Sequence, residues 1–246
     1  MEKFFDVKLV FEQIPTILRY LPVTLELAFI SLIFGLILGL IIAVIKMKKI
    51  PVLTQISNVY ISIIRGTPII VQLYVTYFGI PLFLRYINYV NGTDYKVHGV
   101  PPIIYAFVAL AVNESAYNAE TIRASLQSVE KGQIEAASAL GMTYFQALKR
   151  IILPEAIVVA LPSLGNSLIG LIKGTSLAFA CSVVEMTAEG KIIAGRTYRY
   201  FEVYISLAII YWLITIVIEQ GLKFLEKKVQ IPDEVPKNAY EGITEQ

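Results

Sequence analysis

The chain has 246 residues, of which 56% are hydrophobic and 16% are charged. A water-soluble domain of this length carries nearer a quarter charged residues, so much of the apolar surface must face lipid. The formal net charge is only +2, which argues against electrostatic steering toward nucleic acid. The chain has one cysteine and one histidine, which argues against an internal disulfide and against a metal site built from these residues.

The apolar segments predict an all-α, polytopic membrane protein with five transmembrane helices. A membrane helix needs about 20 mostly apolar residues to cross a core of about 30 Å. The predicted spans are residues 27–45, 56–84, 100–122, 156–172 and 203–218, the last extending to residue 224. Residues 1–20 mix acidic and basic side chains, unlike a cleavable signal peptide, so the first span is expected to be retained. The short apolar segment 174–184 is expected to be a re-entrant or capping piece.

The first three spans carry features that bear on packing or on a solute path. Gly35 and Gly39 in the first have the spacing of small residues that permits close contact between membrane helices. Residues 65–68 (Arg-Gly-Thr-Pro) interrupt the second. Because Pro68 lacks the N–H that would pair with an earlier carbonyl, the helix is predicted to open there. The second half of the third span contains Asn113, Glu114, Asn118 and Glu120.

Basic residues predict an orientation with the N-terminus outside and the C-terminus inside. Lys and Arg are enriched in cytoplasmic loops. They occur here after span one, after span three and beyond span five: Lys46, Lys48, Lys49, Lys131, Lys149, Arg150, Lys223, Lys227 and Lys228. Residues 1–228 are predicted to form one permease domain, and residues 229–246 a polar cytoplasmic tail. The odd number of spans and the lack of an internal repeat argue against the two-halves construction of many secondary transporters.

The loop between spans three and four, residues 125–155, is predicted to form two short helices on the cytoplasmic face. Residues 135–140 are alanine-rich and favour a helix. Gly141 suits a helix end or a sharp change of direction, and Thr143 is a candidate cap for a second short helix. Pro154 fits the first turn of span four. Such a unit would transmit a rigid push into the membrane.

The spacing Glu135-Ala136-Ala137, three residues, Gly141, nine residues, Ile-x-Leu153-Pro154 resembles the signature loop of ATP-binding-cassette (ABC) importer permeases. Residues 65–68 with Gln72, residues 113–120, and residues 165–167 followed by 173–176 resemble the polar amino acid branch of that family. The resemblance implies that the loop fits a groove on a nucleotide-binding subunit. The residues expected to couple to that ATPase are Glu135, Ala136, Ala137, Gly141, Leu153 and Pro154.

Several polar residues in or near the spans are candidates for holding the solute. They are Arg65, Gln72, Asn113, Ser115, Tyr117, Asn166 and Ser167. An ionisable residue in a membrane helix normally faces a polar interior or a partner, and the guanidinium fork of Arg65 matches a carboxylate. The alternative is that Arg65 pairs with Glu114 or Glu120 and holds spans two and three together. Ser167 supplies no carboxylate for a cationic solute, and with residues 173–178 it resembles permeases for cystine.

The leading hypothesis is a transport subunit of an ABC importer in the bacterial plasma membrane, carrying a polar amino acid such as cystine or a related sulfur amino acid. Glutamine, glutamate and basic amino acids are alternatives within this class. The chain has no Walker loop, so it is not expected to be an enzyme or to bind a cofactor. ATP and Mg would be bound by partner ATPase subunits, and a second permease, identical or not, and an extracellular binding protein are further expected partners. Alternatives from other classes are an ion-coupled carrier or channel and a non-transporting scaffold.

Overall fold

The computed structural model describes residues 4–95, 97 and 99–229, and every regular element in this part of the chain is a helix. The all-α prediction is confirmed for these residues. The helices are α1 (Val7–Leu18), α2 (Leu21–Met47), α3 (Leu53–Gly66), α4 (Ile69–Asn91), α5 (Pro102–Gln127), α6 (Lys131–Ala139), α7 (Tyr144–Ala147), the π-helix η1 (Leu148–Ile152), α8 (Leu153–Gly174), the 3₁₀ helix η2 (Thr175–Cys181), α9 (Met186–Thr197) and α10 (Tyr200–Val229). The tail predicted for residues 229–246 lies outside the described residues beyond Val229.

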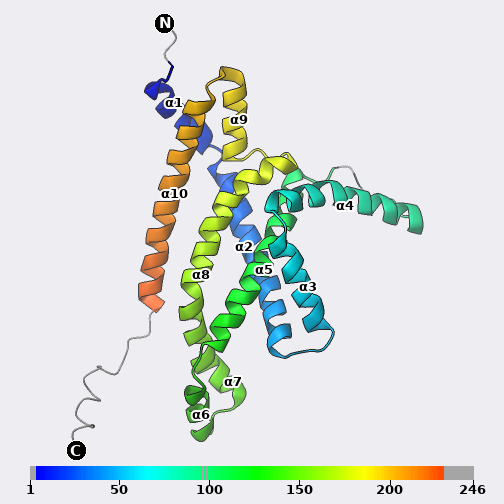
Figure 1. The fold of residues 1–246 in the computed structure, drawn as a ribbon, viewed down its shortest axis with the longest axis vertical. Coiled ribbons are helices and arrows are strands. Elements are labelled where there is room, and N and C mark those ends of the chain that lie inside the picture. Colours follow the sequence, from blue (N-terminus) through cyan, green and yellow to red (C-terminus); the bar gives the residue numbers. More distant parts are fainter. Residues whose placement is uncertain (1–3, 96, 98, 230–246) are drawn as a thin grey trace, which may run out of the picture.

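The long helices run up and down along one axis of the molecule (Figure 1). From their N-terminal ends, α2, α5 and α10 descend in this view, whereas α3 and α8 ascend. The C-terminal ends of α2 and α10 therefore lie toward the same end of the molecule as α6 and α7. These are the segments that carry most of the basic residues predicted to be cytoplasmic.

Within the described residues, four helical segments are long and apolar enough to cross a membrane: α2, α4, the stretch Tyr144–Cys181 and α10. Helix α5 has 26 residues, but the polar residues in its second half keep it outside this set. Segment 174–184 was expected to be a re-entrant or capping piece rather than a further span. Its first part, η2, directly continues α8 as a 3₁₀ helix of seven residues, and re-entry of the segment stays a prediction. Five crossings therefore remain a prediction.

The segment predicted as one interrupted second span, residues 56–84, is two helices. Helix α3 ends at Gly66 and α4 begins at Ile69, and Thr67 and Pro68 between them are extended. The break is where Pro68 predicted it. However, α4 changes direction and leaves the body of the molecule (Figure 1), and Gln72 and Leu73 are its buried residues. The single crossing expected here is corrected to a short helix followed by a projecting one.

Helices α2 and α5 pack in close contact. A Cβ added at Gly35 would lie 2.7 Å from the Cβ of Glu114, and one at Gly39 would lie 3.0 Å from the backbone nitrogen of Ala119. The two contacts advance four and five residues along the two helices in the same direction, so α2 and α5 pack in parallel. This confirms the close contact that the spacing of Gly35 and Gly39 permits.

We expect Gly35→Ala to destabilise the protein, because the added methyl group forces the α2–α5 seam apart. Overpacking of this kind costs about 1–3 kcal/mol, which exceeds the helix propensity of about 1 kcal/mol that alanine gains over glycine. Thermal unfolding of the purified protein measures the effect. Gly79→Ala in α4 is the matched control, since its Cβ meets nothing within 4 Å and only the propensity gain remains. Equal unfolding temperatures for the two variants would contradict this packing.

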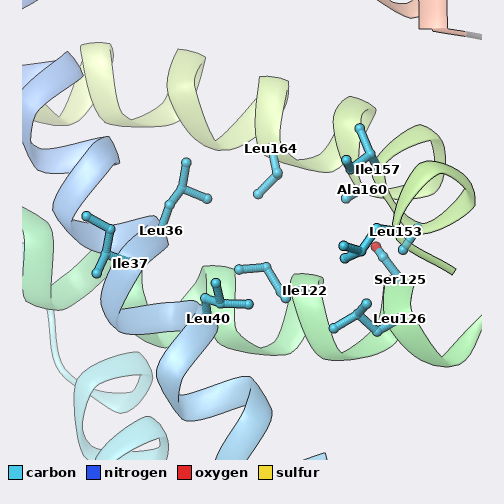
Figure 2. A pocket seen from close by; sticks show the side chains of 11 residues that line it. Leu36, Ile37, Leu40, Ile122, Ser125, Leu126, Leu153, Ile157, Ala160 and Leu164 are labelled. Atoms are coloured by element: carbon cyan, nitrogen blue, oxygen red, sulfur yellow. The ribbon is translucent and has the colours of Figure 1, made fainter. Parts of the chain in front are cut away.

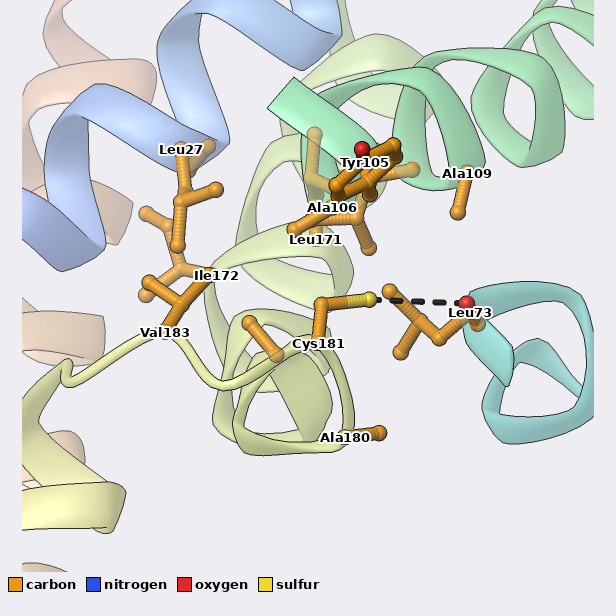
Figure 3. Close-up of a cluster of buried hydrophobic side chains, with 13 residues drawn as sticks. Leu27, Leu73, Tyr105, Ala106, Ala109, Leu171, Ile172, Ala180, Cys181 and Val183 are labelled. Carbon is orange, nitrogen blue, oxygen red and sulfur yellow. Dashed lines mark hydrogen bonds between the residues drawn. The ribbon is translucent and has the colours of Figure 1, made fainter. Parts of the chain in front are cut away.

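A buried apolar cluster joins η2 to α2, α4 and α5 around Cys181 (Figure 3). The Cys181 Sγ is fully buried and donates to the backbone oxygen of Leu73 at 3.4 Å. Leu27, Tyr105 and Ile172 also belong to the cluster. This cluster fixes the first turns of α4, and hence the position of the helix break, relative to the rest of the fold.

Helices α1 and α9 were not predicted from the sequence, and both pack against the N-terminal half of α10. The buried Glu185 caps α9 by accepting a hydrogen bond from the Ala188 N–H at 2.8 Å, and the Tyr211 hydroxyl donates to it at 3.1 Å. Burial raises the pKa of Glu185, although these donors oppose the shift. The Ser206 hydroxyl donates to the Val10 carbonyl at 2.7 Å. These contacts hold three helices together at the end of the molecule opposite α6.

Candidate functional site

The side chain of Gln72 donates hydrogen bonds to the free backbone oxygens at the break between α3 and α4. Because Pro68 has no N–H, the carbonyl of Ile64, four residues earlier, lacks its helical donor. Gln72 Nε2 donates to this oxygen at 2.8 Å and to the carbonyl and hydroxyl oxygens of Thr67 at 3.1 and 2.8 Å. The Thr67 hydroxyl donates in turn to the Ile63 carbonyl at 2.9 Å. The irregular backbone is thus satisfied by side chains, as buried polar groups require.

Asn113, Tyr117 and Arg65 gather beside this break. Asn113 Nδ2 donates to Gln72 Oε1 at 3.1 Å, which links α5 to α4. Tyr117 follows Asn113 by four residues and shares its helix face. The Arg65 guanidinium carbon lies 5.0 Å from the centroid of the Tyr117 ring, within cation–π range. Arg65 and Tyr117 are both exposed. Four predicted solute residues, Arg65, Gln72, Asn113 and Tyr117, therefore form one group, here called the break cluster.

Ser115 lies apart from the break cluster. It is fully buried, and its Oγ is 2.6 Å from the Tyr60 hydroxyl of α3. Residues two apart on a helix do not face each other, so Ser115 and Asn113 point in different directions. Ser115 holds α3 against α5. The sequence analysis did not single out Tyr60.

Glu120 forms ion pairs, but not with Arg65. Its Oε2 accepts from Arg123 Nη2 at 2.8 Å, and its Oε1 is paired with Lys46 Nζ at the end of α2. In the described part of the chain, Arg65 has no ion pair with either Glu114 or Glu120. The expected ion pair of Arg65 is thus absent from these residues. Lys46 pairs with Glu120 instead, and Arg65 contacts α5 through the Tyr117 ring.

Asn166 and Ser167 stand on α8, separate from the break cluster. Asn166 is exposed and Ser167 is half-buried. Neither is joined by a hydrogen bond to the break cluster in residues 4–95, 97 and 99–229. The preceding residue, Gly165, packs against α10, where a Cβ would lie 2.8 Å from Leu222. These two residues are a second candidate position for solute rather than part of the first.

An apolar cavity of about 290 Å³ lies between α2, α5 and α8. Figure 2 shows its lining of aliphatic side chains, among them Leu36, Ile122 and Ile157. Ser125 contributes the one hydroxyl in the lining, and it already donates to the Thr121 carbonyl at 2.9 Å. Such a lining has no group to replace the hydration of a polar solute. A polar solute is therefore not expected to bind in this cavity.

A more polar hollow of about 310 Å³ lies where α4 faces the start of α5. Tyr77, Arg85 and Tyr105 line it, and the rings of the two tyrosines are 5.5 Å apart at right angles. The Tyr77 hydroxyl lies 3.1 Å from the Ser182 Oγ after η2. The sequence contained no signal for this hollow, because its residues are scattered and follow no motif.

The loop after α5 forms two short helices at one end of the molecule, as predicted. Helix α6 ends beside Gly141, whose φ of +77° is the left-handed turn that favours glycine. The Gly141 N–H donates to the Ser138 carbonyl at 3.0 Å. Thr143 then caps α7 with a full capping box, in which the side chains of Thr143 and Gln146 each bond to the other's backbone N–H.

Helix α7 continues without a break into α8. The π-turn η1 joins them, and Pro154 lies in the first turn of α8, as predicted. The sequence did not predict η1. The helical path from α7 therefore runs unbroken along α8 into the body of the molecule. Around Gly141 the surface is apolar: Leu140, Tyr144 and Phe145 are each at least 70% exposed. Of the predicted coupling residues, Ala137 is buried, whereas Glu135, Ala136, Gly141, Leu153 and Pro154 are exposed.

Residues 35–231 match the family described as binding-protein-dependent transport system inner membrane component. The chain belongs to this family. It is accordingly a multi-pass permease of the bacterial plasma membrane, in agreement with the long apolar helices.

Relatives and a solved structure cover most of the permease. It is 45% identical to the probable amino-acid permease protein YxeN of Bacillus subtilis (strain 168), over 82% of this chain and 86% of that one. It is 40% identical to the L-cystine transport system permease protein TcyL of the same organism, over 94% of both. A chain in the crystal structure of an amino acid ABC transporter with histidines aligns with a TM-score of 0.78 and 36% identity, over 92% of this chain and 100% of that one.

Proposed function

We propose that the permease is the transmembrane subunit of an ABC importer that carries a polar amino acid across the plasma membrane. The observation that carries the proposal is the α6–α7 unit, which exposes an apolar surface at the end of the molecule and continues as one helical rod into α8. Such a unit suits a soluble ATPase subunit whose movements push on the membrane helices. The names of the relatives point to amino acids as the solutes.

The energy for transport is proposed to come from partner subunits. Two ATPase subunits would bind ATP and Mg and hold the loop of residues 125–155 in a groove, contacting Glu135, Ala136, Gly141 and the start of α8. The permease would pair with a second copy or a related permease, because five helices are few to enclose a path. An extracellular binding protein would deliver the solute. Residues 1–228 would act as a single domain.

The break cluster is proposed to hold the solute in the membrane. Arg65 is exposed beside a broken helix, and irregular backbone at membrane depth is tolerated where it lines a cavity or is buried in protein. Its guanidinium would bind the solute carboxylate, while Tyr117 holds it in place by stacking. Asn166 and Ser167 would contact the solute from α8.

Orientation is tested by labelling single cysteines on intact cells with a maleimide that does not cross membranes. We propose that the N-terminus is outside and the α6–α7 end is inside. We therefore expect Arg196→Cys in α9 to label on intact cells and Leu140→Cys to label only after permeabilisation. Both positions are exposed, and the native Cys181 is fully buried, so background labelling is expected to be low. Labelling of Leu140→Cys from outside would place the α6–α7 unit on the outer side of the membrane and contradict the proposal.

The solute is tested by competition for uptake in vesicles that contain the complete importer. We propose cystine or a related sulfur amino acid, because Ser167 offers no carboxylate to a cationic solute and TcyL is named for cystine. Cystine is expected to compete at concentrations at least about tenfold lower than arginine or glutamine. Strong inhibition by arginine with none by cystine would contradict the cystine assignment and leave the importer class intact.

A further inference from the structure

The hydrogen bonds of the break cluster have a defined direction that starts at Pro68. The Ile64 and Thr67 carbonyls can only accept hydrogen bonds, so the nitrogen end of the Gln72 amide must face them. Gln72 Oε1 is then fixed on the opposite edge. Only a donor can bind it there, and Asn113 Nδ2 does so at 3.1 Å.

The same logic fixes the orientation of Asn113. Since its nitrogen is committed to Gln72, its Oδ1 lies on the other edge of the amide. Among the described residues no group donates to this oxygen, which leaves it available as a hydrogen-bond acceptor. Asn113 is half-buried, and its Oδ1 is not one of the fully buried, unpaired side-chain atoms of the described residues.

Asn113 and Tyr117, the ring over which Arg65 of α3 lies, share one face of α5. Asn113 and Tyr117 are four residues apart on α5, which places them about one helical turn, roughly 5.4 Å, from each other. Arg65 sits over the Tyr117 ring at 5.0 Å. This face therefore presents a neutral acceptor about one helical turn from the ring over which the guanidinium lies. A free α-amino acid has the complementary pattern, because its ammonium and carboxylate are attached to one carbon.

We propose that Gln72 is a positioning residue that turns Asn113 Oδ1 toward the solute, so that Asn113 accepts from the α-ammonium while Arg65 binds the α-carboxylate. The inference rests on the proposed function and deepens it. The substrate class is an amino acid with both α-groups free. Acylation of the amino group removes one anchor, and esterification of the carboxylate removes the other.

The test measures binding to the full chain in nanodiscs without a binding protein, so that all discrimination comes from the permease. Radiolabelled L-cystine and L-glutamine are the probes, and unlabelled competitors are the free, N-acetylated and methyl-ester forms of each. We expect each modification to weaken competition at least about tenfold, since each removes a charge-assisted hydrogen bond.

Variants then separate the two anchors. In Asn113→Leu, the free and N-acetylated competitors are expected to compete within about twofold of each other. The methyl ester should still compete as much more weakly than the free form as it does with the wild type. Asn113→Asp retains an acceptor and should retain the N-acetyl penalty. Gln55→Leu and Asn58→Leu, at exposed positions on α3, are matched controls and should keep both penalties.

Two Gln72 variants separate positioning from a merely structural role. Gln72→Leu frees Asn113 to rotate and should lose most of the N-acetyl penalty. Gln72→Glu loses the bonds to Ile64 and Thr67 but still accepts from Asn113, so the ratio between free and N-acetylated competitors should be preserved even if overall affinity falls.

The inference would be overturned if Asn113→Leu still discriminated against the N-acetylated competitor as strongly as the wild type does. It would also be overturned if Gln72→Glu lost this discrimination to the same extent as Gln72→Leu. A wild-type chain that binds both probes without discriminating against N-acetylation would also overturn it and leave the importer assignment standing. A wild-type chain that binds neither probe would contradict the assignment of a solute of the cystine or glutamine type.

Discussion

Gly141→Asp is expected to abolish transport and association with the ATPase while leaving the permease folded and inserted. A Cβ at Gly141 meets nothing within 4 Å, and aspartate tolerates the left-handed backbone conformation better than most residues. The change strains the turn at φ +77° but causes no steric clash, so the chain is expected to fold and insert. The surrounding surface, formed by Leu140, Tyr144 and Phe145, is apolar and exposed. A carboxylate buried there on docking would cost several kcal/mol.

A penalty of this size corresponds to at least about 100-fold weaker association. Copurification of the ATPase and uptake in vesicles measure it. Gly141→Asn has the same shape without the charge and should lose much less. Gly195→Asp in α9 adds the same charge at the opposite end of the molecule, where a Cβ also meets nothing within 4 Å, and should leave ATPase association unchanged. Normal uptake by Gly141→Asp would refute the docking role of the loop.

The loop was well predicted because its structure depends on local signals. Gly141 requires a left-handed turn, Thr143 forms a capping box within four residues, and Pro154 lies in a first helical turn. Each is decided by neighbours in the sequence. The π-turn η1 was missed, since its extra backbone residue has no comparable sequence signal.

Other features depend on contacts between distant parts of the chain. The break at Pro68 was predicted from its missing N–H, but the departure of α4 from the body depends on packing around Leu73 and Cys181, which are 108 residues apart. Helices α1 and α9 are short and mix polar with apolar residues, so neither resembles a membrane span. They are stabilised by α10, as the bond from Ser206 to Val10 shows.

The candidate site was predicted in composition but not in arrangement. Helix periodicity alone separates Ser115 from Asn113 and Tyr117, and could have shown that the three do not share a face. The partners of Arg65 and Glu120 were harder to predict from the sequence, because Lys46 reaches Glu120 from another helix. Gln72 forms hydrogen bonds with Ile64, Thr67 and Asn113 at the helix break, and no local sequence pattern connects these residues.

Arg65→Ala is expected to leave the transporter assembled but to reduce its uptake of solute strongly. Arg65 is exposed and forms no ion pair within residues 4–95, 97 and 99–229, so little folding free energy depends on it. A bidentate, charge-assisted bond to a carboxylate contributes about 1.5–3 kcal/mol. Uptake should therefore fall by about 10- to 100-fold, while ATPase copurification and ATP binding stay unchanged.

Arg65→Lys should recover only part of the uptake, because an ammonium keeps the charge but loses the planar fork that pairs with a carboxylate and stacks on Tyr117. Arg19→Ala removes an exposed arginine between α1 and α2, away from the break, and should transport normally. If Arg65→Ala were fully active, the carboxylate would have to be held elsewhere. Asn166 and Ser167 on α8 would then become the leading candidates. If it failed to assemble, Arg65 would instead have a structural role at the break between α3 and α4.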